Sequence, residues 1–153
     1  MKNENPPMEP IIIRNVRPSD FEQIYEFIRA LENETFEKAQ QRSILAGNLR
    51  DPKHIYLIAL LEDEAVGFLS CHVQNLLHHN GLIGEIQEMF IKSEKRNLGI
   101  GKKLVDTLKV MAKAKNIIQL EVTANNEREA AHGFYEKRDF RHTHKKFVYR
   151  VGV

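Results

Sequence analysis

Apolar and polar positions along this chain follow first a strand period and then a helix period, and each change predicts a new element. The β-branched residues at 11–16 predict an opening strand. Apolar residues then recur at helical spacing as far as Leu31, which predicts a helix capped by Ser19 or Asp20. A second and less regular helix is expected over residues 34–49.

The middle of the chain has the pattern of neighbouring strands. The continuous apolar run at 55–61 is typical of a strand covered on both faces. An acidic turn at 62–64 joins it to a second strand at 65–73, so the two form a predicted hairpin. A loop at 76–81 then leads to a third strand of this group at 83–91.

The last third of the chain alternates between helix and strand. The predicted elements are a helix from Gly99 to about Lys115, a strand at 117–123, a helix at about 127–137, and a closing hairpin of 140–144 and 146–151. The order β-α-α-β-β-β-α-β-α-β-β predicts an α/β fold, a mixed sandwich around one twisted sheet. We expect one domain at 11–153 and, because residues 1–10 are polar with three prolines, a disordered lead-in before it.

Composition excludes several classes of protein. No apolar run approaches the ~18–20 residues of a membrane span, so no membrane partner is predicted. The single cysteine, Cys71, excludes an internal disulfide and suits a reducing cytoplasm; its apolar strand context predicts a buried, inert thiol. Residues 92–115 carry eight basic and two acidic side chains, whereas the whole chain is only +2. This basic stretch suits a phosphorylated ligand, but it lacks the interleaved aromatic residues and motifs of a nucleic-acid surface.

A glycine turn at the start of the predicted helix lies within the basic stretch 92–115 and could bind the phosphorylated ligand. Strand, basic turn and helix start together form an anion-binding device, because helix N-termini carry unpaired N–H groups and a partial positive charge. The two common nucleotide motifs do not fit, since Leu104 and Lys103 stand where they require glycine and Ser or Thr. The pattern that fits is Arg-x-x-Gly-x-Gly, at Arg96, Gly99 and Gly101.

This pattern resembles the pyrophosphate-binding motif of the GNAT superfamily of N-acetyltransferases, which bind acetyl-CoA. The order of elements over 11–151 is similar to that superfamily, and so is the segment from Arg128 to Glu136, although Asp139 replaces the usual glycine after it. The resemblance implies a mostly antiparallel sheet flanked by helices on both faces. It also implies acetyl-CoA as co-substrate, bound by residues of the strand, the turn and a later loop: Met89, Phe90, Ile91, Arg96, Asn97, Leu98, Gly99, Ile100, Gly101, Lys102 and Asn125.

The acetyl-transfer chemistry needs a base, oxyanion donors and an acid. Backbone N–H groups at Met89–Ile91 could stabilise the oxyanion and pair with the pantetheine arm. Glu85 is the predicted base and Glu88 the second candidate, and alternation places them on opposite faces of a regular strand, with Glu85 beside Met89 and Ile91. The alternative is a carboxylate that only positions the amine. Tyr135 is the predicted acid for the thiolate, with an ordinary half-buried tyrosine as the alternative.

The acceptor is a small amine in this interpretation. Residues 48–52, 77–79 and 84–88 resemble aminoalkylphosphonate N-acetyltransferases, which implies an aminoalkylphosphonate as acceptor and Glu85 as the base. A polyamine, an aminoglycoside, a protein amine or a non-catalytic acyl-CoA module remain alternatives. The histidines are compatible with a divalent metal ion, but their spacing matches no metal-binding motif, so no ligands are predicted. A homodimer is compatible with the sequence, although no segment has the pattern of an interface. The residues that could supply positive charge or metal ligands are His78, His79, His132, Arg141, His142 and His144.

Overall fold

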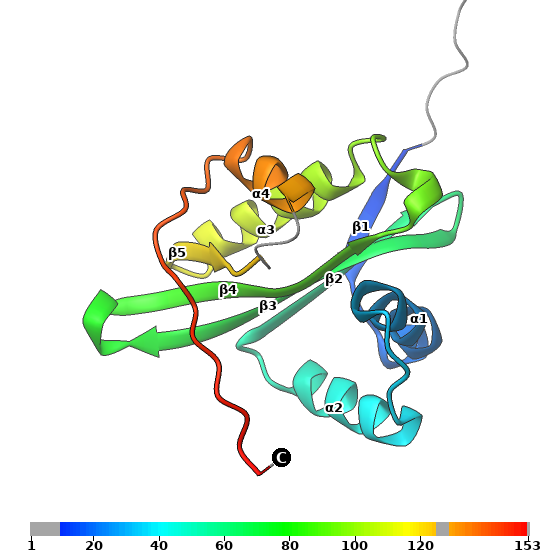
Figure 1. Cartoon of the computed structure of the whole chain (residues 1–153). Helices are drawn as coiled ribbons and strands as arrows, with labels where there is room; N and C mark the ends of the chain where they lie inside the picture. The colour runs from blue at the N-terminus through cyan, green and yellow to red at the C-terminus, as the bar shows by residue number, and fades with distance from the viewer. Residues whose placement is uncertain (1–9, 125–128, 153) are drawn as a thin grey trace, which may run out of the picture.

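The computed structural model describes residues 10–124 and 129–152, which form a single twisted sheet with helices on both faces (Figure 1). The strands lie in the order β1-β2-β3-β4-β5. The first four are antiparallel neighbours and β5 is parallel to β4, which confirms the mixed, mostly antiparallel α/β fold. Their bounds are β1 Ile12–Asn15, β2 His54–Leu61, β3 Glu64–Leu76, β4 Gly81–Ile91 and β5 Ile117–Val122.

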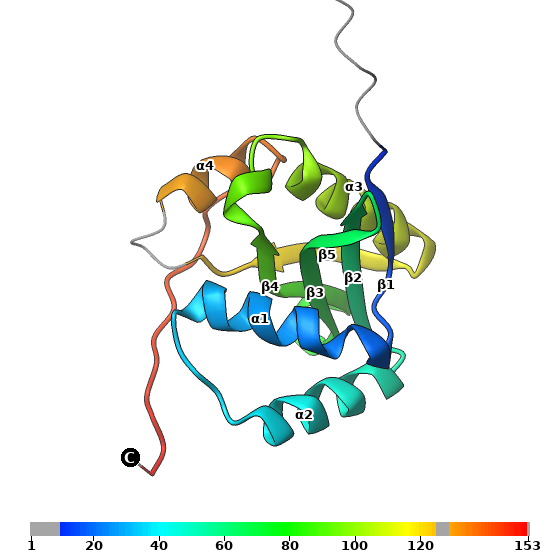
Figure 2. The same ribbon diagram turned by 90° about the vertical axis from the view of Figure 1, so that its right-hand side faces the viewer.

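The helices divide between two apolar cores, one on each face of the sheet (Figure 2). α1 (Phe21–Glu32) and α2 (Lys38–Arg50) cover one face, where Phe27 stacks on Phe68 of β3. α3 (Ile100–Ala114) and α4 (Glu129–Glu136) cover the other face. None of these helices has both the length and the apolar content that a membrane span requires.

The apolar pattern of α3 explains why this helix binds to the sheet. Five apolar residues on one stripe of the helix are at most 4% exposed. Full burial of such aliphatic side chains contributes about 1.5–3 kcal/mol each, so the stripe fixes the helix and its N-terminal turn against β3 and β4. The buried residues of the stripe are Ile100, Leu104, Val105, Leu108 and Ala112.

The start of α1 differs from the prediction that a side chain caps it. Asp20 precedes the helix, but its carboxylate makes no capping bond. It accepts two bonds from Arg14 of β1, at 2.7 and 2.8 Å, and one from the N–H of Arg17 at 2.7 Å. The carboxylate therefore ties the first strand to the turn before α1.

The predicted closing hairpin at 140–144 and 146–151 is wrong in the described structure. Residues 140–150 form neither strand nor helix, and residues 151 and 152 form a turn. Alternation alone marks a segment that could pair, but a strand also needs a neighbour to complete its hydrogen bonds. A turn does form before this segment, with Asp139 in the left-handed region at a φ of 69°.

Candidate active site

The glycine turn lies between the end of β4 and α3. Gly99 precedes the helix with a φ of 81°, and Asn97 is also left-handed at 65°. Within residues 10–124 and 129–152, no heavy atom lies within 4 Å of the place where a Cβ on Gly99 would stand. The first N–H groups of α3 have no acceptor within the helix, so this open turn can donate hydrogen bonds to a phosphate group.

The side chains of the turn are on the surface. Arg96, Asn97 and Leu98 are all exposed, and Arg96 adds a permanent positive charge beside the N–H groups. Lys102 lies in the first turn of α3, where its Nζ is 2.6 Å from the carboxylate of Asp106. The chemistry of this turn therefore fits the pyrophosphate of coenzyme A through main-chain donors and the guanidinium group.

Gly101 has a different role from Gly99. A Cβ at this position would lie 3.2 Å from two ring carbons of Phe134 in α4. The missing side chain therefore lets the ring of Phe134 pack against the first turn of α3. Because Phe134 and the neighbouring Tyr135 both line a cavity, this close approach also shapes the site.

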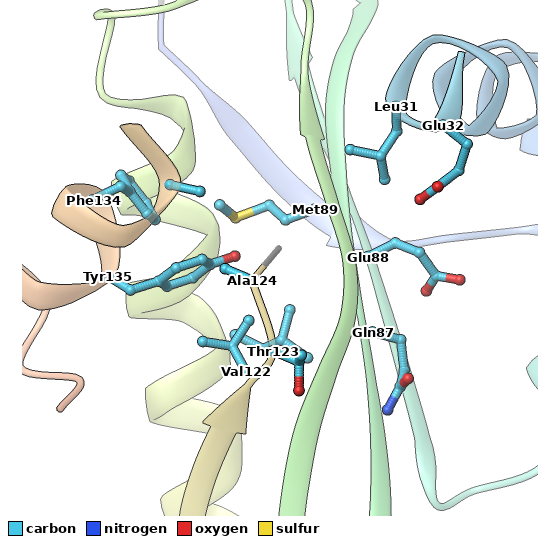
Figure 3. Close-up of a pocket in the computed structure, with 12 residues that line it drawn as sticks. Leu31, Glu32, Gln87, Glu88, Met89, Val122, Thr123, Ala124, Phe134 and Tyr135 are labelled. Atoms are coloured by element: carbon cyan, nitrogen blue, oxygen red, sulfur yellow. The ribbon is translucent and has the colours of Figure 1, made fainter. Parts of the chain in front are cut away.

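A cavity of about 290 Å³ lies between β4, the end of β5, α1 and α4 (Figure 3). Leu31 and Glu32 border it from α1, on one side of β4, and Phe134 and Tyr135 from α4, on the other. The cavity thus reaches both faces of the sheet. Its other lining residues are Ile86, Gln87, Glu88, Met89, Val122, Thr123, Ala124 and Ala131.

A β-bulge in β4 sets the direction of the side chains around this cavity. Ser70 of β3 pairs with Glu88, but the next residue, Cys71, pairs with Ile86, so Gln87 is left as an extra residue. The bulge reverses the alternation. As a result Ile86 and Met89, three positions apart, both pack in the core on the α3 side.

The expected faces of the two glutamates are therefore corrected. Glu85 pairs across the strands with His72, and Glu88 with Ser70. Because of the bulge both carboxylates lie on the α1/α2 side, and Glu85 is not beside Met89 and Ile91 as regular alternation predicts. Figure 3 shows Glu88 and Met89 on opposite sides of β4.

Of these two carboxylates, Glu88 is the one that lines the cavity. Its N–H donates to the hydroxyl of the fully buried Ser70 at 3.1 Å, and that hydroxyl donates to its carboxylate. Burial raises the pKa of Glu88, the Ser70 bond lowers it in part, and the charge of Glu32 raises it further. A carboxylate with a raised pKa is a better proton acceptor for an amine than an exposed one.

Tyr135 reaches the same cavity from α4. Its side chain is buried, and its ring makes edge contacts with Phe134 and Phe140 at centroid distances of 5.2 and 5.6 Å. Figure 3 shows its hydroxyl on the cavity side of the ring, directed toward β4. The structure thus brings Tyr135, Met89 and Glu88 to one cavity, whereas Glu85 is not among its lining residues.

A polar network extends from β3 to α2 on the same face as the glutamates, and sequence reasoning missed it. Tyr56 of β2 accepts a bond from the amide of Asn48 at 2.9 Å, and its hydroxyl is 3.1 Å from Nε2 of His72. His72 also stacks on His54, with ring centroids 3.9 Å apart. Burial raises the pKa of Tyr56 to about 12 and lowers the pKa of His72, which favours the neutral form of both side chains. The available signal was the spacing of polar residues in otherwise apolar strands.

The remaining residues that the sequence analysis singled out differ in burial and in the face of the sheet on which they lie. Cys71 is fully buried, as predicted, and burial raises its thiol pKa to about 12. Phe90 packs on the α1 side, 5.4 Å from the ring of Phe27. Asn125 and Arg128 lie outside the described residues. Within residues 10–124 and 129–152, no group of three or more His, Cys, Asp or Glu side chains could hold a metal ion.

Comparison with known proteins shows the family to which a chain with this site is similar. A model described as the acetyltransferase (GNAT) family matches residues 21–140. An aminoalkylphosphonate N-acetyltransferase of Salmonella typhimurium is 32% identical over 136 residues, which cover 89% of this chain and 88% of the relative.

Solved structures share the same arrangement of elements. A transcriptional regulator from Bacillus halodurans has a TM-score of 0.85 at 23% identity, covering 92% of this chain and 99% of its own. An aminoglycoside N-acetyltransferase in complex with CoA has a TM-score of 0.85 at 14% identity, covering 97% and 99%. At these identities the likeness shows the fold alone.

Proposed function

The chain belongs to the acetyltransferase (GNAT) family and is an acetyl-CoA-dependent N-acetyltransferase, and we propose that its acceptor is a small primary amine, namely an aminoalkylphosphonate. The observation that carries the proposal is the cavity at the β4 bulge, which the half-buried carboxylate of Glu88 and the ring of Tyr135 line from opposite sides of the strand. The substrate class is supported by the relative at 32% identity.

The donor would bind from the side of α3 and α4. The glycine turn with Arg96 would hold the pyrophosphate, and the backbone of Met89–Ile91 would hold the pantetheine arm in the gap beyond the end of β5. Asn125 would be a further donor-binding residue. Acetyl-CoA supplies an activated thioester, and the cavity lies where the carbonyl group of that thioester could meet backbone N–H groups of β4.

The acceptor would enter from the side of α1 and α2. Glu88 takes a proton from the ammonium group, and the neutral nitrogen then attacks the thioester carbon. The C–S bond breaks, Tyr135 gives its phenolic proton to the thiolate sulfur, and the second proton that the nitrogen loses as the amide forms restores the phenol. Glu85, on the same face as Glu88, would hold the incoming ammonium group. It is also the alternative base, because the resemblance of the sequence assigns it that role.

The test is the release of coenzyme A thiol from acetyl-CoA with 2-aminoethylphosphonate as acceptor. Propylamine and an aminoglycoside are the comparison acceptors, and each assay is run with and without a divalent cation. Turnover that depends on the phosphonate group supports the proposal. Turnover with another amine alone contradicts the proposed substrate and leaves the family activity in place. If Glu85→Gln abolishes turnover and Glu88→Gln does not, the base is Glu85.

We also propose a cytoplasmic location, supported by Cys71, which is the one cysteine of the chain and lies fully buried as a free thiol. The proposed reaction uses two small molecules and requires neither nucleic acid nor a membrane.

A further inference from the structure

Two histidines lie side by side on the face of the sheet that carries the proposed base. His54 of β2 and His72 of β3 are direct partners across the strands, and their rings stack with centroids 3.9 Å apart. The neighbour of His72 on the other side is Glu85 of β4. Both histidines are partly exposed, whereas Ser70, two residues before His72, is fully buried. The pair therefore lies where this face of the sheet begins to open.

His54 already uses both of its ring nitrogens. Nδ1 is 3.3 Å from the backbone carbonyl of Asn48, which can only accept, so this nitrogen carries a proton. Nε2 is 3.8 Å from the carboxylate of Asp51, and the negative charge there favours the protonated ring. His54 thus supports His72 by stacking and has no nitrogen left for a ligand.

His72 uses only one of its two ring nitrogens. The amide of Asn48 donates to the hydroxyl of Tyr56 at 2.9 Å, and this hydroxyl is 3.1 Å from Nε2 of His72. Because the hydroxyl oxygen already accepts from Asn48, its own proton is available for Nε2, which favours the neutral tautomer with the proton on Nδ1. Among the described residues, Nδ1 has no hydrogen-bond acceptor, and it is not one of the enclosed polar atoms. The network therefore holds an N–H donor that no residue of the described structure uses.

The polar groups of this face are divided between the strands by charge. The imidazoles lie on β2 and β3, the carboxylates of Glu85 and Glu88 lie on β4, and Glu32 of α1 borders the cavity on the same side. Neighbouring strands are about 4.8 Å apart, a similar span to the two carbon atoms between the ammonium and phosphonate groups of 2-aminoethylphosphonate. The carboxylates would repel an isolated anion, so this arrangement suits an anion that carries its own ammonium group.

We propose that His72 binds the phosphonate group of the acceptor through Nδ1, while the ammonium group of the same molecule lies against Glu88 and Glu85. This inference rests on the proposed function and adds the residue that selects an anionic acceptor. An N–H group that donates to an ionised oxygen forms a hydrogen bond roughly twice as strong as one between neutral groups. Tyr56 and Asn48 act through His72, because they hold its ring by the opposite nitrogen.

Two substitutions of His72 separate ligand binding from a structural role. The amide nitrogen of asparagine can take the place of Nδ1, and that of glutamine the place of Nε2. His72→Gln therefore keeps the bond to Tyr56 and loses the free donor, whereas His72→Asn does the reverse. The readout is kcat/KM for 2-aminoethylphosphonate divided by kcat/KM for propylamine. We expect this ratio to fall by about 10- to 100-fold in His72→Gln, as for loss of a hydrogen bond to a charged group, and to change by less than about threefold in His72→Asn.

His78→Gln is the matched control, because His78 is exposed at the tip of the hairpin between β3 and β4. Its ratio should equal that of wild type. A ratio that His72→Gln keeps and His72→Asn loses would follow the bond to Tyr56 and overturn the proposal.

The NMR signal of Nδ1 in wild-type protein gives a second readout that does not depend on a variant. The signal of His72, identified by its loss in His72→Gln, should move when 2-aminoethylphosphonate is added and stay in place with propylamine. An unmoved signal at saturating 2-aminoethylphosphonate would overturn the proposal. If wild type does not prefer the phosphonate over propylamine, the proposed acceptor is wrong and the role of His72 fails with it. If that preference is present in wild type and unchanged in His72→Gln, only the role of His72 fails.

Discussion

Ser70 and Glu88 bind each other twice across the ladder between β3 and β4. The Ser70 hydroxyl accepts a hydrogen bond from the N–H of Glu88 at 3.1 Å and donates one to the carboxylate of the same residue. The first bond fixes the backbone directly after the bulge at Gln87, and the second fixes the carboxylate. One fully buried hydroxyl therefore sets both the path of β4 and the position of the proposed base.

The Ser70→Ala variant tests this positioning. We expect kcat to fall by about tenfold, which corresponds to loss of one hydrogen bond to a charged group. The acidic limb of the pH–rate profile should shift to higher pH, because the lost donor stabilised the ionised carboxylate and lowered its pKa. Ser70→Cys, with a weaker donor of similar size, should lie between wild type and alanine. An unchanged pH profile in Ser70→Ala would contradict the role in ionisation.

Ser93→Ala is the matched control. Ser93 is exposed, and its hydroxyl donates a long hydrogen bond of 3.3 Å to the neighbouring Glu94. It lies near the donor side of the site but is not among the residues that line the cavity. Its rate and pH profile should equal those of wild type.

The Glu88→Gln variant should separate activity from stability. Loss of a general base lowers kcat by about 10²–10⁴-fold. Burial raises the pKa of Glu88 in the folded state above its unfolded value. Between these two values the folded protein binds the extra proton, so stability falls as the pH rises through this window. Because glutamine carries no charge, the variant should have a higher Tm than wild type at pH 7–8.

Thermal unfolding of wild type and Glu88→Gln at several pH values checks this sign. The difference in Tm should shrink as the pH is lowered toward 4 and the wild-type carboxylate becomes protonated. A variant that is less stable than wild type at pH 8 would mean that the carboxylate stabilises the fold, and the argument from burial would fail.

The Tyr135→Phe variant removes the proposed acid and keeps the ring contacts with Phe134 and Phe140. We expect kcat to fall by about 10²-fold while KM for acetyl-CoA stays within a factor of about three, because the loss is confined to the protonation of the leaving thiolate. Steady-state rates with acetyl-CoA as the varied substrate check this. A large rise in KM with unchanged kcat would indicate a donor-binding role instead.

Much of the fold and the glycine turn of the site follow from local sequence patterns, whereas the directions of the two glutamates do not. The stripe of α3 and the glycine turn were predictable because helix periodicity and the Arg-x-x-Gly-x-Gly spacing are contained in short segments. The faces of Glu85 and Glu88 were not, because a bulge depends on the partner strand. A signal did exist in Ser70 and His72, the two polar residues between Ala65 and Val73 in β3. The closing hairpin failed for a related reason, since alternation at 146–151 does not specify which strand covers it.

The Arg14–Asp20 pair should contribute to stability in a pH-dependent way. The side-chain hydrogen bond from Arg14 is the main reason that the pKa of Asp20 lies below its usual value. Its contribution is complete above the ordinary pKa of about 3.9 and is lost as the pH falls through the lower folded value. We expect Asp20→Asn to cost about 3 kcal/mol at pH 7, as for a largely buried pair that loses one partner.

Urea unfolding at pH 7 and at pH 3 measures this contribution. Asp106→Asn is the control, since Asp106 pairs with Lys102 on an exposed helix face at 2.6 Å and should cost at most about 0.5 kcal/mol. Equal costs for the two variants at pH 7 would contradict the assigned role of Asp20.

Three glycine-to-alanine variants distinguish donor binding from packing. Gly99→Ala adds a Cβ into open space but at a φ of 81°, so strain of about 1–2 kcal/mol should distort the turn and raise KM for acetyl-CoA. Gly101→Ala places its Cβ 3.2 Å from Phe134, so it should displace that ring and lower kcat as well.

Gly133→Ala in α4 is the control, because no heavy atom of the described residues lies within 4 Å of its added Cβ and alanine is favoured in a helix by about 0.8–1 kcal/mol. It should raise the Tm and leave both kinetic constants unchanged. If Gly99→Ala has the kinetics of this control, the open turn does not hold the donor phosphates, since the strain is localised at the place where they would bind. If Gly101→Ala has those kinetics, the packing of Phe134 on α3 does not shape the cavity.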